Sequence, residues 1–368
     1  MHDVFNNRLA RARAAADAAG IDALLITPGS DLRYLTGYAA LPLERLTCLV
    51  LPVDGEVVLV VPELEAPAAR ASAAGESQLR IEPWAETDDP VALVARMLPQ
   101  ARRVALDDHM WAEKVLRFRV AMPATEQVVA GSVLSGLRIV KDSAELDALR
   151  AAAEAIDRVH ARVPEWLKSG RTEREVGRDI ADAIIAEGHE SVDFVIVAAG
   201  PNGASPHHET GERLIRAGDP VVVDIGGTTA AGYCSDETRT YVIGEPPAGF
   251  VTEYGALKQA QEAAVAQVRP GVSAESVDAA ARDVLREAGL GEYFVHRTGH
   301  GIGLDTHEDP YIVAGNARPL EPGMAFSIEP GFYLPDRYGA RIEDIVVVTD
   351  DGVERLNRRP RELTIIEP

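Results

Sequence analysis

Histidine and aspartate residues gather in the second half of the chain. Five of the nine histidines fall between positions 207 and 307. The segment PVVVDIGGTTAAGYCSDETRTY places Asp224 at the end of a valine-rich run and Asp236 at the start of the next run. A turn at Gly226-Gly227 would bring both carboxylates to one end of a sheet, where buried like charges are costly without a cation or a shared proton. Aspartates in turns or helix caps are the alternative.

Further candidate ligands follow in three downstream segments. RTGHGIGLDTHEDP surrounds His300 with glycines, which let the backbone approach another group closely, and His307 follows seven residues later. FSIEPGFY sets Glu329 at the end of an apolar strand, and ARIEDIVVV sets Glu343 inside one. For Glu343 the alternative is a solvent-facing position, produced by simple alternation along a strand.

These two Asp, one His and two Glu side chains form a set suited to metal-assisted hydrolysis. Carboxylate oxygens with one imidazole suit Mn²⁺, Co²⁺ or Zn²⁺. Four carboxylates balance two divalent cations, and two cations about 3.5–4 Å apart can generate a bridging hydroxide and polarise a carbonyl, as amide hydrolysis requires. Other common motifs are absent: His208-Glu209 does not begin an HExxH site, and neither a GxSxG elbow nor a GxxxxGK[ST] phosphate loop occurs.

The first part of the chain alternates between helical and strand patterns. Residues 4–19 have helical spacing, and Ala23–Thr27 is a short apolar run typical of a buried strand. Cys48–Pro62 contains two β-rich runs around Asp54-Gly55, a strong hairpin signal, and another strand is expected near Arg103–Leu106. The pattern predicts an α/β domain with a mixed sheet over residues 1–136.

From residue 137 the pattern changes, and a second domain is predicted over residues 137–368. A long helix capped by Ser143 is expected, followed by a helix with a Thr172/Glu175 capping box. Strands and helices that do not alternate strictly predict an α+β domain with helices layered on a mostly antiparallel sheet. The expected strands are Phe194–Ala198, Pro220–Ile225, Thr238–Ile243, Met324–Glu329 and Arg341–Thr349, and the later helices are Thr252–Val268 and Ser273–Ala288.

Charge and cysteine content exclude several classes of protein. The chain has 58 acidic and 37 basic residues, a net charge of −21, which disfavours binding to nucleic acid or to an anionic membrane. Cys48 and Cys234 are the only cysteines, which indicates neither a disulfide framework nor a thiolate zinc site. No signal peptide or 18-residue apolar run is present, so we expect a cytoplasmic protein.

The dispersed segments VDIGG…GYCSDETRT, TGHGIGLDTHE, SIEPG and RIED resemble, in this order, the pita-bread metallopeptidases, which include prolidase, aminopeptidase P and methionine aminopeptidase. The preceding stretch resembles the N-terminal domain of the creatinase, prolidase and aminopeptidase P branch. The resemblance implies a creatinase-like α/β domain followed by a pita-bread catalytic domain, and it makes methionine aminopeptidase a distant alternative.

The resemblance also implies a ligand set for two divalent metal ions. Asp224 would bind one metal, Asp236 and Glu343 would bridge both, and His300 and Glu329 would complete the second. Mn²⁺ is the leading candidate, with Co²⁺ and Zn²⁺ as alternatives.

Three more side chains are implied in catalysis and substrate binding. His207 matches a substrate-binding histidine, His307 a histidine that stabilises the scissile carbonyl or passes a proton, and Arg341 an arginine common in the proline-specific branch. Glu329 is expected to shuttle a proton in addition to binding metal. His208 and His296 are expected to be bystanders.

The expected reaction is hydrolysis of Xaa-Pro bonds, most simply in dipeptides, as in a prolidase. Aminopeptidase P activity on longer Xaa-Pro peptides is the alternative, and a metal-free binding module or creatinase-type hydrolase is a distant one. Arg45 is a candidate for binding a substrate carboxylate, although an ordinary exposed arginine explains it as well. The resemblance further implies a homodimer.

Overall fold

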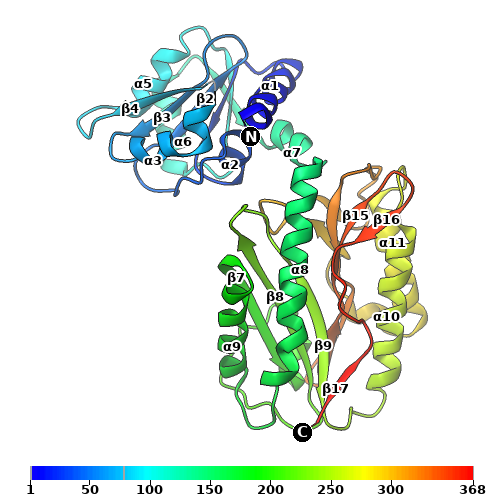
Figure 1. Cartoon of the computed structure of the whole chain (residues 1–368). Coiled ribbons are helices and arrows are strands. Elements are labelled where there is room, and N and C mark those ends of the chain that lie inside the picture. Colours follow the sequence, from blue (N-terminus) through cyan, green and yellow to red (C-terminus); the bar gives the residue numbers. More distant parts are fainter. Residues whose placement is uncertain (1, 78, 368) are drawn as a thin grey trace. The chain divides into compact units, whose positions relative to one another are not determined.

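The chain is organised as two compact units, Met1–Arg138 and Ile139–Pro368 (Figure 1). The computed structural model describes residues 2–77 and 79–367. Within these ranges, no helix combines the length and the apolar character needed to cross a membrane. Each unit is described by itself below.

The first unit is an α/β domain built on one mixed sheet of six strands. Its strand order is β4-β3-β2-β1-β5-β6, with β1–β2 and β2–β3 antiparallel and the other three pairs parallel. The expected hairpin around Asp54-Gly55 is present as β2 and β3. The strands are β1 (Ala23–Ile26), β2 (Cys48–Pro52), β3 (Val58–Pro62), β4 (Arg80–Trp84), β5 (Arg103–Leu106) and β6 (Glu126–Val129). The helices are α1 (His2–Ala18), α2 (Ser30–Thr36), α3 (Ala66–Ala71), α4 (Ala73–Glu76), α5 (Pro90–Met97), α6 (Ala112–Ala121) and α7 (Gly131–Arg138).

The second unit contains two larger sheets and a hairpin. One sheet has the order β17-β9-β8-β7, and the other is antiparallel with the order β11-β10-β12-β15-β16. Its helices are α8 (Ser143–Trp166), α9 (Glu173–Ala186), α10 (Phe250–Gln267) and α11 (Ala274–Glu287). The strands of the first sheet are β7 (His189–Ala199), β8 (Pro220–Thr229), β9 (Glu237–Ile243) and β17 (Thr364–Ile366). The remaining strands are β10 (Gly299–Gly301), β11 (Glu308–Ile312), β12 (Ala325–Ile328), β15 (Asp344–Val348) and β16 (Val353–Arg355), with β13 (Gly331–Leu334) and β14 (Tyr338–Arg341) forming the hairpin.

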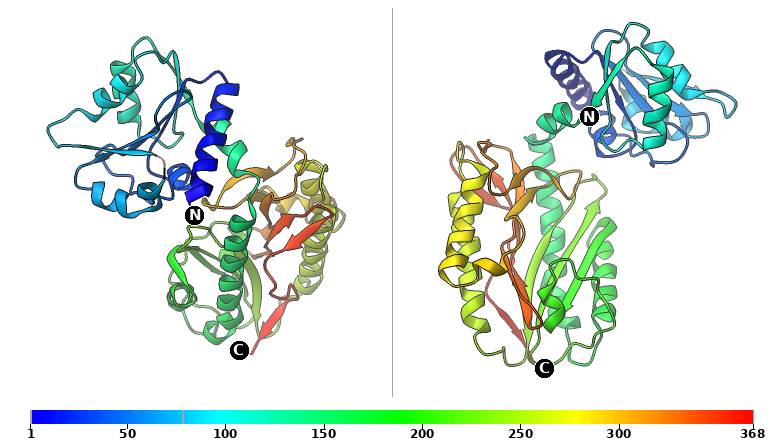
Figure 2. Two further views of the ribbon diagram at one scale, coloured as in Figure 1. Left: turned by 45° about the horizontal axis from the view of Figure 1, so that its top comes forward. Right: turned by 180° about the vertical axis from the view of Figure 1, so that it is seen from behind.

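The helices of the second unit lie outside its strands, in two pairs (Figure 2). Helices α8 and α9 pack on the β7–β8–β9 sheet through a buried apolar cluster that includes Ile156, Ile180 and Val223. Helices α10 and α11 pack on the other sheet through a second cluster that includes Leu257, Leu285 and Phe326. The inner faces of the strands are therefore available for polar side chains. This arrangement confirms the predicted α+β class, with helices layered on mostly antiparallel strands.

The start of the second unit differs from the predicted cap. Asp142, rather than Ser143, is the N-cap of α8, and its side chain forms a capping box with Glu145. The Asp142 carboxylate can accept the hydrogen bond of the Glu145 N–H in the same way as a serine hydroxyl, one position earlier. The predicted Thr172/Glu175 capping box of α9 is confirmed.

Two strand predictions near the acidic residues were wrong in their limits. Strand β8 does not end at Ile225 but continues through Gly226-Gly227 to Thr229. Gly226 admits the ring of Phe194 and the carbonyl of Ser235, and Gly227 admits the carbonyl of Ser191, at distances that a Cβ atom would forbid. The predicted strand over 341–349 is interrupted at Ile342 and Glu343, because β14 pairs with β13 whereas β15 pairs with β12.

Candidate metal centre

Eight residues singled out by sequence line one cavity of about 710 Å³ in the second unit. They come from strands of both sheets and from the loops between them, so only the fold brings them together. These eight are Asp224, Asp236, His300, Glu329, Glu343, His207, His307 and Arg341.

Strand alternation directs Asp224 and Asp236 into this cavity. In β8, Val223 and Ile225 point into the apolar core beneath α8 and α9, so Asp224 between them points to the opposite face. Asp224 pairs in register with Thr238 of β9, and Asp236 precedes that threonine by two residues on the same face. The two carboxylates therefore face the same side of the sheet, although Asp224 lies in the middle of β8 and not at its end.

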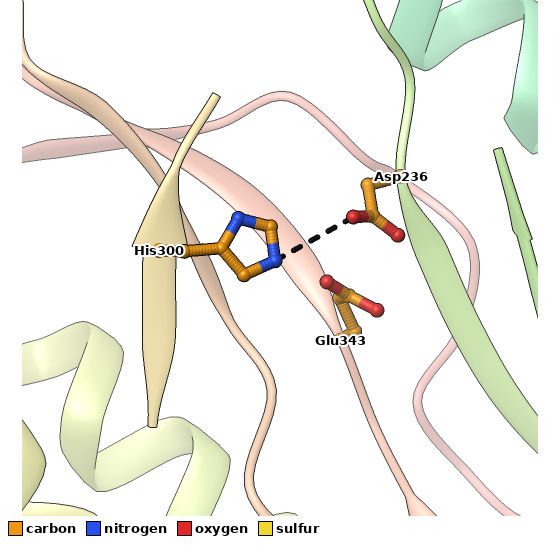
Figure 3. A group of neighbouring side chains, drawn as sticks. All are labelled: Asp236, His300 and Glu343. Carbon is orange, nitrogen blue, oxygen red and sulfur yellow. Dashed lines mark ion pairs between the residues drawn. The ribbon is translucent and has the colours of Figure 1, made fainter. Parts of the chain in front are cut away.

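Asp236, His300 and Glu343 form the tightest group of potential ligand atoms, all within 4.8 Å of one another (Figure 3). The Nε2 atom of His300 lies 3.7 Å from Oδ2 of Asp236 and 3.2 Å from Oε1 of Glu329. All three members of the group are buried. Glu329 follows directly after β12 and so reaches the same point from the second sheet.

The position of His300 depends on the glycines beside it. A Cβ atom at Gly299 would collide with the carbonyl oxygen of Ser327, and one at Gly301 with that of Asp309. Strand β10 can therefore pack this closely between β11 and β12 only with glycine at both positions. The Nδ1 atom of His300 lies 3.2 Å from the Gly301 carbonyl oxygen, and Nε2 is the ring nitrogen directed at the carboxylates.

Arg341 and Thr238 each hold one carboxylate, those of Asp224 and Glu343, through only one of its two oxygens. The Nη2 atom of Arg341 donates to Oδ2 of Asp224 at 2.5 Å, and Oδ1 of Asp224 has no hydrogen-bond partner within the described chain. Thr238 Oγ1 donates to Oε2 of Glu343 at 2.7 Å and leaves Oε1 of Glu343 without a partner in the same ranges. Each carboxylate thus has one oxygen anchored by the protein and one buried oxygen available.

The electrostatics of this group are those of crowded like charges. Burial raises the pKa of Asp236 well above its ordinary value, and the charges of Glu343, Asp224 and Glu329 raise it further. Burial likewise raises the pKa of Glu343, with Glu329 and Asp224 as the main additional causes. Burial also opposes ionisation of Glu329, but the hydrogen bond from His300 and the nearby positive charges outweigh it, so the pKa of Glu329 is lowered.

This donor set fits divalent cations. Isolated buried carboxylates are strongly unfavourable unless a positive charge compensates them, and buried acceptors without partners are uncommon in folded proteins. Here the open oxygens of Asp224 and Glu343 and the Nε2 atom of His300 are the atoms that a metal with mixed oxygen and nitrogen ligands would use.

His307 and His296 also border the cavity. The rings of His307 and His300 meet edge to face, with centroids 4.0 Å apart. Burial, with the neighbouring positive charges, lowers the pKa of His307 to about 4, so its imidazole is neutral at pH 7 and retains one N–H donor. His296, expected to be a bystander, lines the cavity, and its Nε2 atom lies 2.8 Å from the Tyr333 hydroxyl.

Tyr333 is a residue that sequence reasoning missed. Its hydroxyl accepts a hydrogen bond from Nη1 of Arg341 at 2.8 Å and contacts His296, so it joins that histidine to the Arg341–Asp224 pair. The sequence feature that could have identified Tyr333 is its position in the SIEPGFY segment, four residues after the candidate ligand Glu329. Arg45, by contrast, belongs to the first unit, where it lines a separate cavity of about 210 Å³ and lies within 4 Å of the carboxylates of Glu44, Glu65 and Glu86.

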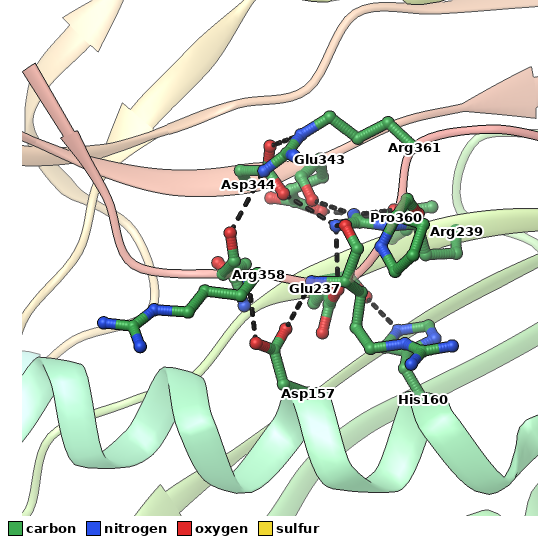
Figure 4. A network of polar contacts seen from close by, with 12 residues as sticks. Asp157, His160, Glu237, Arg239, Glu343, Asp344, Arg358, Pro360 and Arg361 are labelled. Atoms are coloured by element: carbon green, nitrogen blue, oxygen red, sulfur yellow. Dashed lines mark hydrogen bonds and ion pairs between the residues drawn. The ribbon is translucent and has the colours of Figure 1, made fainter.

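Behind Glu343 a buried network of charges supports the site (Figure 4). Arg239 donates from Nη1 to the carbonyl oxygens of Glu343 and Thr238 and from Nη2 to Oδ1 of Asp344, at distances of 2.6, 2.9 and 2.8 Å. It also forms an ion pair with Glu237 at 3.0 Å. Because Arg239 binds the backbone on either side of the Thr238–Glu343 hydrogen bond, it holds both of these side chains in place.

Comparison with known proteins gives matches along nearly the whole chain. The model of Metallopeptidase family M24 matches residues 147–350, and that of the Creatinase/Prolidase N-terminal domain matches residues 8–140. A relative named probable dipeptidase PepE, from Mycobacterium bovis, is 57% identical over 365 residues, which cover 99% of this chain and 97% of that protein.

Solved structures with the same fold include two peptidases. Dipeptidase PepE from Mycobacterium ulcerans has a TM-score of 0.95 and 55% identity, covering 100% of this chain and 99% of that one. Recombinant prolidase from Thermococcus sibiricus has a TM-score of 0.92 and 39% identity, covering 98% of this chain and 99% of that one.

The effect of Asp236→Asn on the free energy of unfolding, relative to the wild type, should change sign between metal-free and metal-loaded protein. In chelator, removing one of several buried like charges should leave the variant at least as stable as the wild type. In Mn²⁺ at a hundred times the dissociation constant, the wild type should gain about 2.7 kcal/mol, and the variant should gain clearly less. Calorimetric unfolding measures both. Asp193→Asn, which alters another cavity-lining carboxylate, is the control and should keep the metal-dependent gain. Equal gains in all three proteins would contradict a ligand role for Asp236.

Arg239→Gln should destabilise the second unit by about 3–5 kcal/mol, because it leaves buried acidic groups without their cation. Urea unfolding provides the measurement. Arg174→Gln removes the exposed ion pair with Glu212 and should cost no more than about 1 kcal/mol. Similar unfolding midpoints for the two variants would show that Arg239 does not hold the site together.

Proposed function

This chain belongs to metallopeptidase family M24, and we propose that it hydrolyses the peptide bond before proline in Xaa-Pro dipeptides. The observation that supports this most directly is the convergence of four carboxylates and one imidazole in a single cavity, several of them with open, buried ligand atoms. The names of the relatives, dipeptidase and prolidase, support a dipeptide as the substrate.

In this proposal, Asp224, Asp236, His300, Glu329 and Glu343 hold two divalent metal ions, with Mn²⁺ as the leading candidate. When bound, such ions lower the pKa of a water molecule and polarise the scissile carbonyl. Asp236 and Glu343 would be the ligands shared by both ions, since their carboxylates belong to this cluster and lie together on one side of the His300 ring (Figure 3).

The protein's own residues then move protons and orient the substrate. Glu329 has a lowered pKa and is therefore a carboxylate at neutral pH, able to accept the proton of the attacking water and return it to the leaving nitrogen. His307 is neutral, so its N–H can donate to the oxyanion that develops on the carbonyl. His207 and Arg341 complete the substrate-binding wall, with Arg341 held against Asp224.

Recognition of a dipeptide requires a group for its free carboxylate, and Arg297 is suited to this task. Arg297 lines the cavity, where its guanidinium lies 4.5 Å from the centre of the Tyr311 ring. Among the described residues it forms no ion pair, whereas Arg341 is already paired with Asp224. We therefore favour Arg297 over Arg45, whose neighbouring glutamates already compensate its charge.

Homodimerisation and a cytoplasmic location are further parts of the proposal, taken from the family resemblance and the sequence composition. Light scattering after size-exclusion chromatography tests the first, and cell fractionation the second.

Purified protein should hydrolyse Xaa-Pro dipeptides in the presence of Mn²⁺ or Co²⁺. Chelation and Asp236→Asn should each reduce kcat by at least about a thousandfold, because both remove the activated water and the carbonyl polarisation. Proline release, measured by chromatography, is the readout, and metal added back to the chelated wild type is the control. Undiminished activity in either case would refute the two-metal mechanism.

Arg297→Gln should discriminate between substrates with and without a free proline carboxylate. We expect kcat/KM for Xaa-Pro to fall about tenfold or more, as for loss of a charge-assisted hydrogen bond, with little change for the Xaa-Pro amide. Wild-type cleavage of Xaa-Pro-Yaa as fast as Xaa-Pro would instead favour aminopeptidase P activity. An equal loss on both the acid and the amide would remove Arg297 from carboxylate recognition.

A further inference from the structure

The cavity wall that carries His207 is not a strand: a 3-10 helix (Gly200–Ala204) is followed there by irregular chain. It follows β7, which ends at Ala199, and extends through residues 200–211. Pro206 and His207 line the cavity, and the Pro206 carbonyl accepts a hydrogen bond from Arg341 at 3.3 Å. A segment without ladder hydrogen bonds needs other contacts to hold a substrate-binding side chain in place.

One buried carboxylate, that of Glu173, accepts hydrogen bonds from several points along this segment. Glu173 is the first residue of α9, and its side chain is fully buried. Its Oε1 atom accepts hydrogen bonds from the Ala199 N–H at 2.8 Å and from Nδ2 of Asn202 at 2.9 Å. Its Oε2 atom accepts from Nε2 of His208 at 2.8 Å and from the Gly211 N–H at 3.3 Å. The donors span the segment from its first to its last residues.

His208 is the donor adjacent in sequence to the cavity-lining His207. Its side chain is 19% exposed and bonds Glu173, whereas the adjacent His207 lines the cavity. Since a carboxylate only accepts hydrogen bonds, His208 must carry a proton on Nε2. Fixing the side chain of His208 on the helix side restricts the backbone from which His207 projects.

We propose that Glu173 and His208 are positioning residues that hold segment 200–211 so that His207 faces the substrate. His208, which sequence patterns mark as a bystander, therefore acts through its neighbour rather than on the substrate. This inference rests on the proposed function, in which His207 contacts the Xaa-Pro substrate.

A double-mutant cycle on the metal-loaded, full-length protein tests the proposal. His208→Ala should lower kcat/KM for an Xaa-Pro dipeptide on the order of ten- to a hundredfold, because small displacements of substrate-binding groups are costly. In a His207→Ala background the same substitution should have little further effect, since residues that act through one another are not additive. His208→Gln retains an N–H donor for Glu173 and should recover most of the loss.

Glu212→Gln is the matched control. It removes the exposed ion pair between Arg174 of α9 and the residue that follows the segment, and it should leave kcat and KM unchanged. Fully additive losses for His207→Ala and His208→Ala, or a failure of His208→Gln to recover activity, would overturn the positioning role.

Hydrogen–deuterium exchange provides a readout that does not depend on activity. In the metal-free protein, His208→Ala should accelerate exchange in residues 200–211, while the wild type and Glu212→Gln remain protected. An inactive wild type would refute the proposed function alone. In that case the exchange measurement decides the positioning role, and unchanged exchange in His208→Ala overturns it.

Discussion

The second unit is built around the convergence of four carboxylates at one buried place. Asp224, Asp236, Glu329 and Glu343 come from two sheets and meet around His300. Buried carboxylates crowded in this way are unfavourable without a compensating positive charge, and the pKa values of Asp236 and Glu343 are raised accordingly. The surrounding structure can therefore be understood as the means of holding these groups together until divalent cations compensate their charge.

Two devices make this convergence tolerable. Strand alternation assigns apolar side chains such as Val223 and Ile225 to the helix-covered face, and leaves the carboxylates to the inner face. Two arginines then balance part of the negative charge. Arg341 donates a hydrogen bond to the carboxylate of Asp224, and Arg239 donates one to the backbone carbonyl of Glu343. Arg341 binds one oxygen of Asp224, and Arg239 binds backbone carbonyls rather than the carboxylate of Glu343, so one oxygen of each of these two carboxylates stays open.

The substrate-binding side of the cavity follows a different principle. There the chain lacks a regular ladder, and a single buried glutamate, Glu173, collects hydrogen bonds from residues up to twelve positions apart, from Ala199 to Gly211. Ligand geometry is thus set by rigid strands, whereas the position of His207 depends on a side-chain network at the start of α9.

The sequence by itself determined the ligand types, their order and the class of each domain. Valine-rich runs, glycine pairs and acidic residues at set positions are local features, and local patterns suffice to predict strands, a capping box and a candidate ligand set. It did not determine where β8 ends, because the need for glycine comes from Phe194 and Ser235 at Gly226 and from Ser191 at Gly227, all of which lie elsewhere in the chain.

Tertiary structure alone decided which side chains support the candidate ligands and which line the cavity. It interrupted the expected strand at Glu343, placed His296 in the cavity wall with Tyr333 bonded to it, and directed His208 to Glu173. None of these outcomes follows from spacing, because each depends on a partner that is distant in sequence. A ligand set can be recognised from residue types in order, but the contacts that orient it exist only after the sheets have packed.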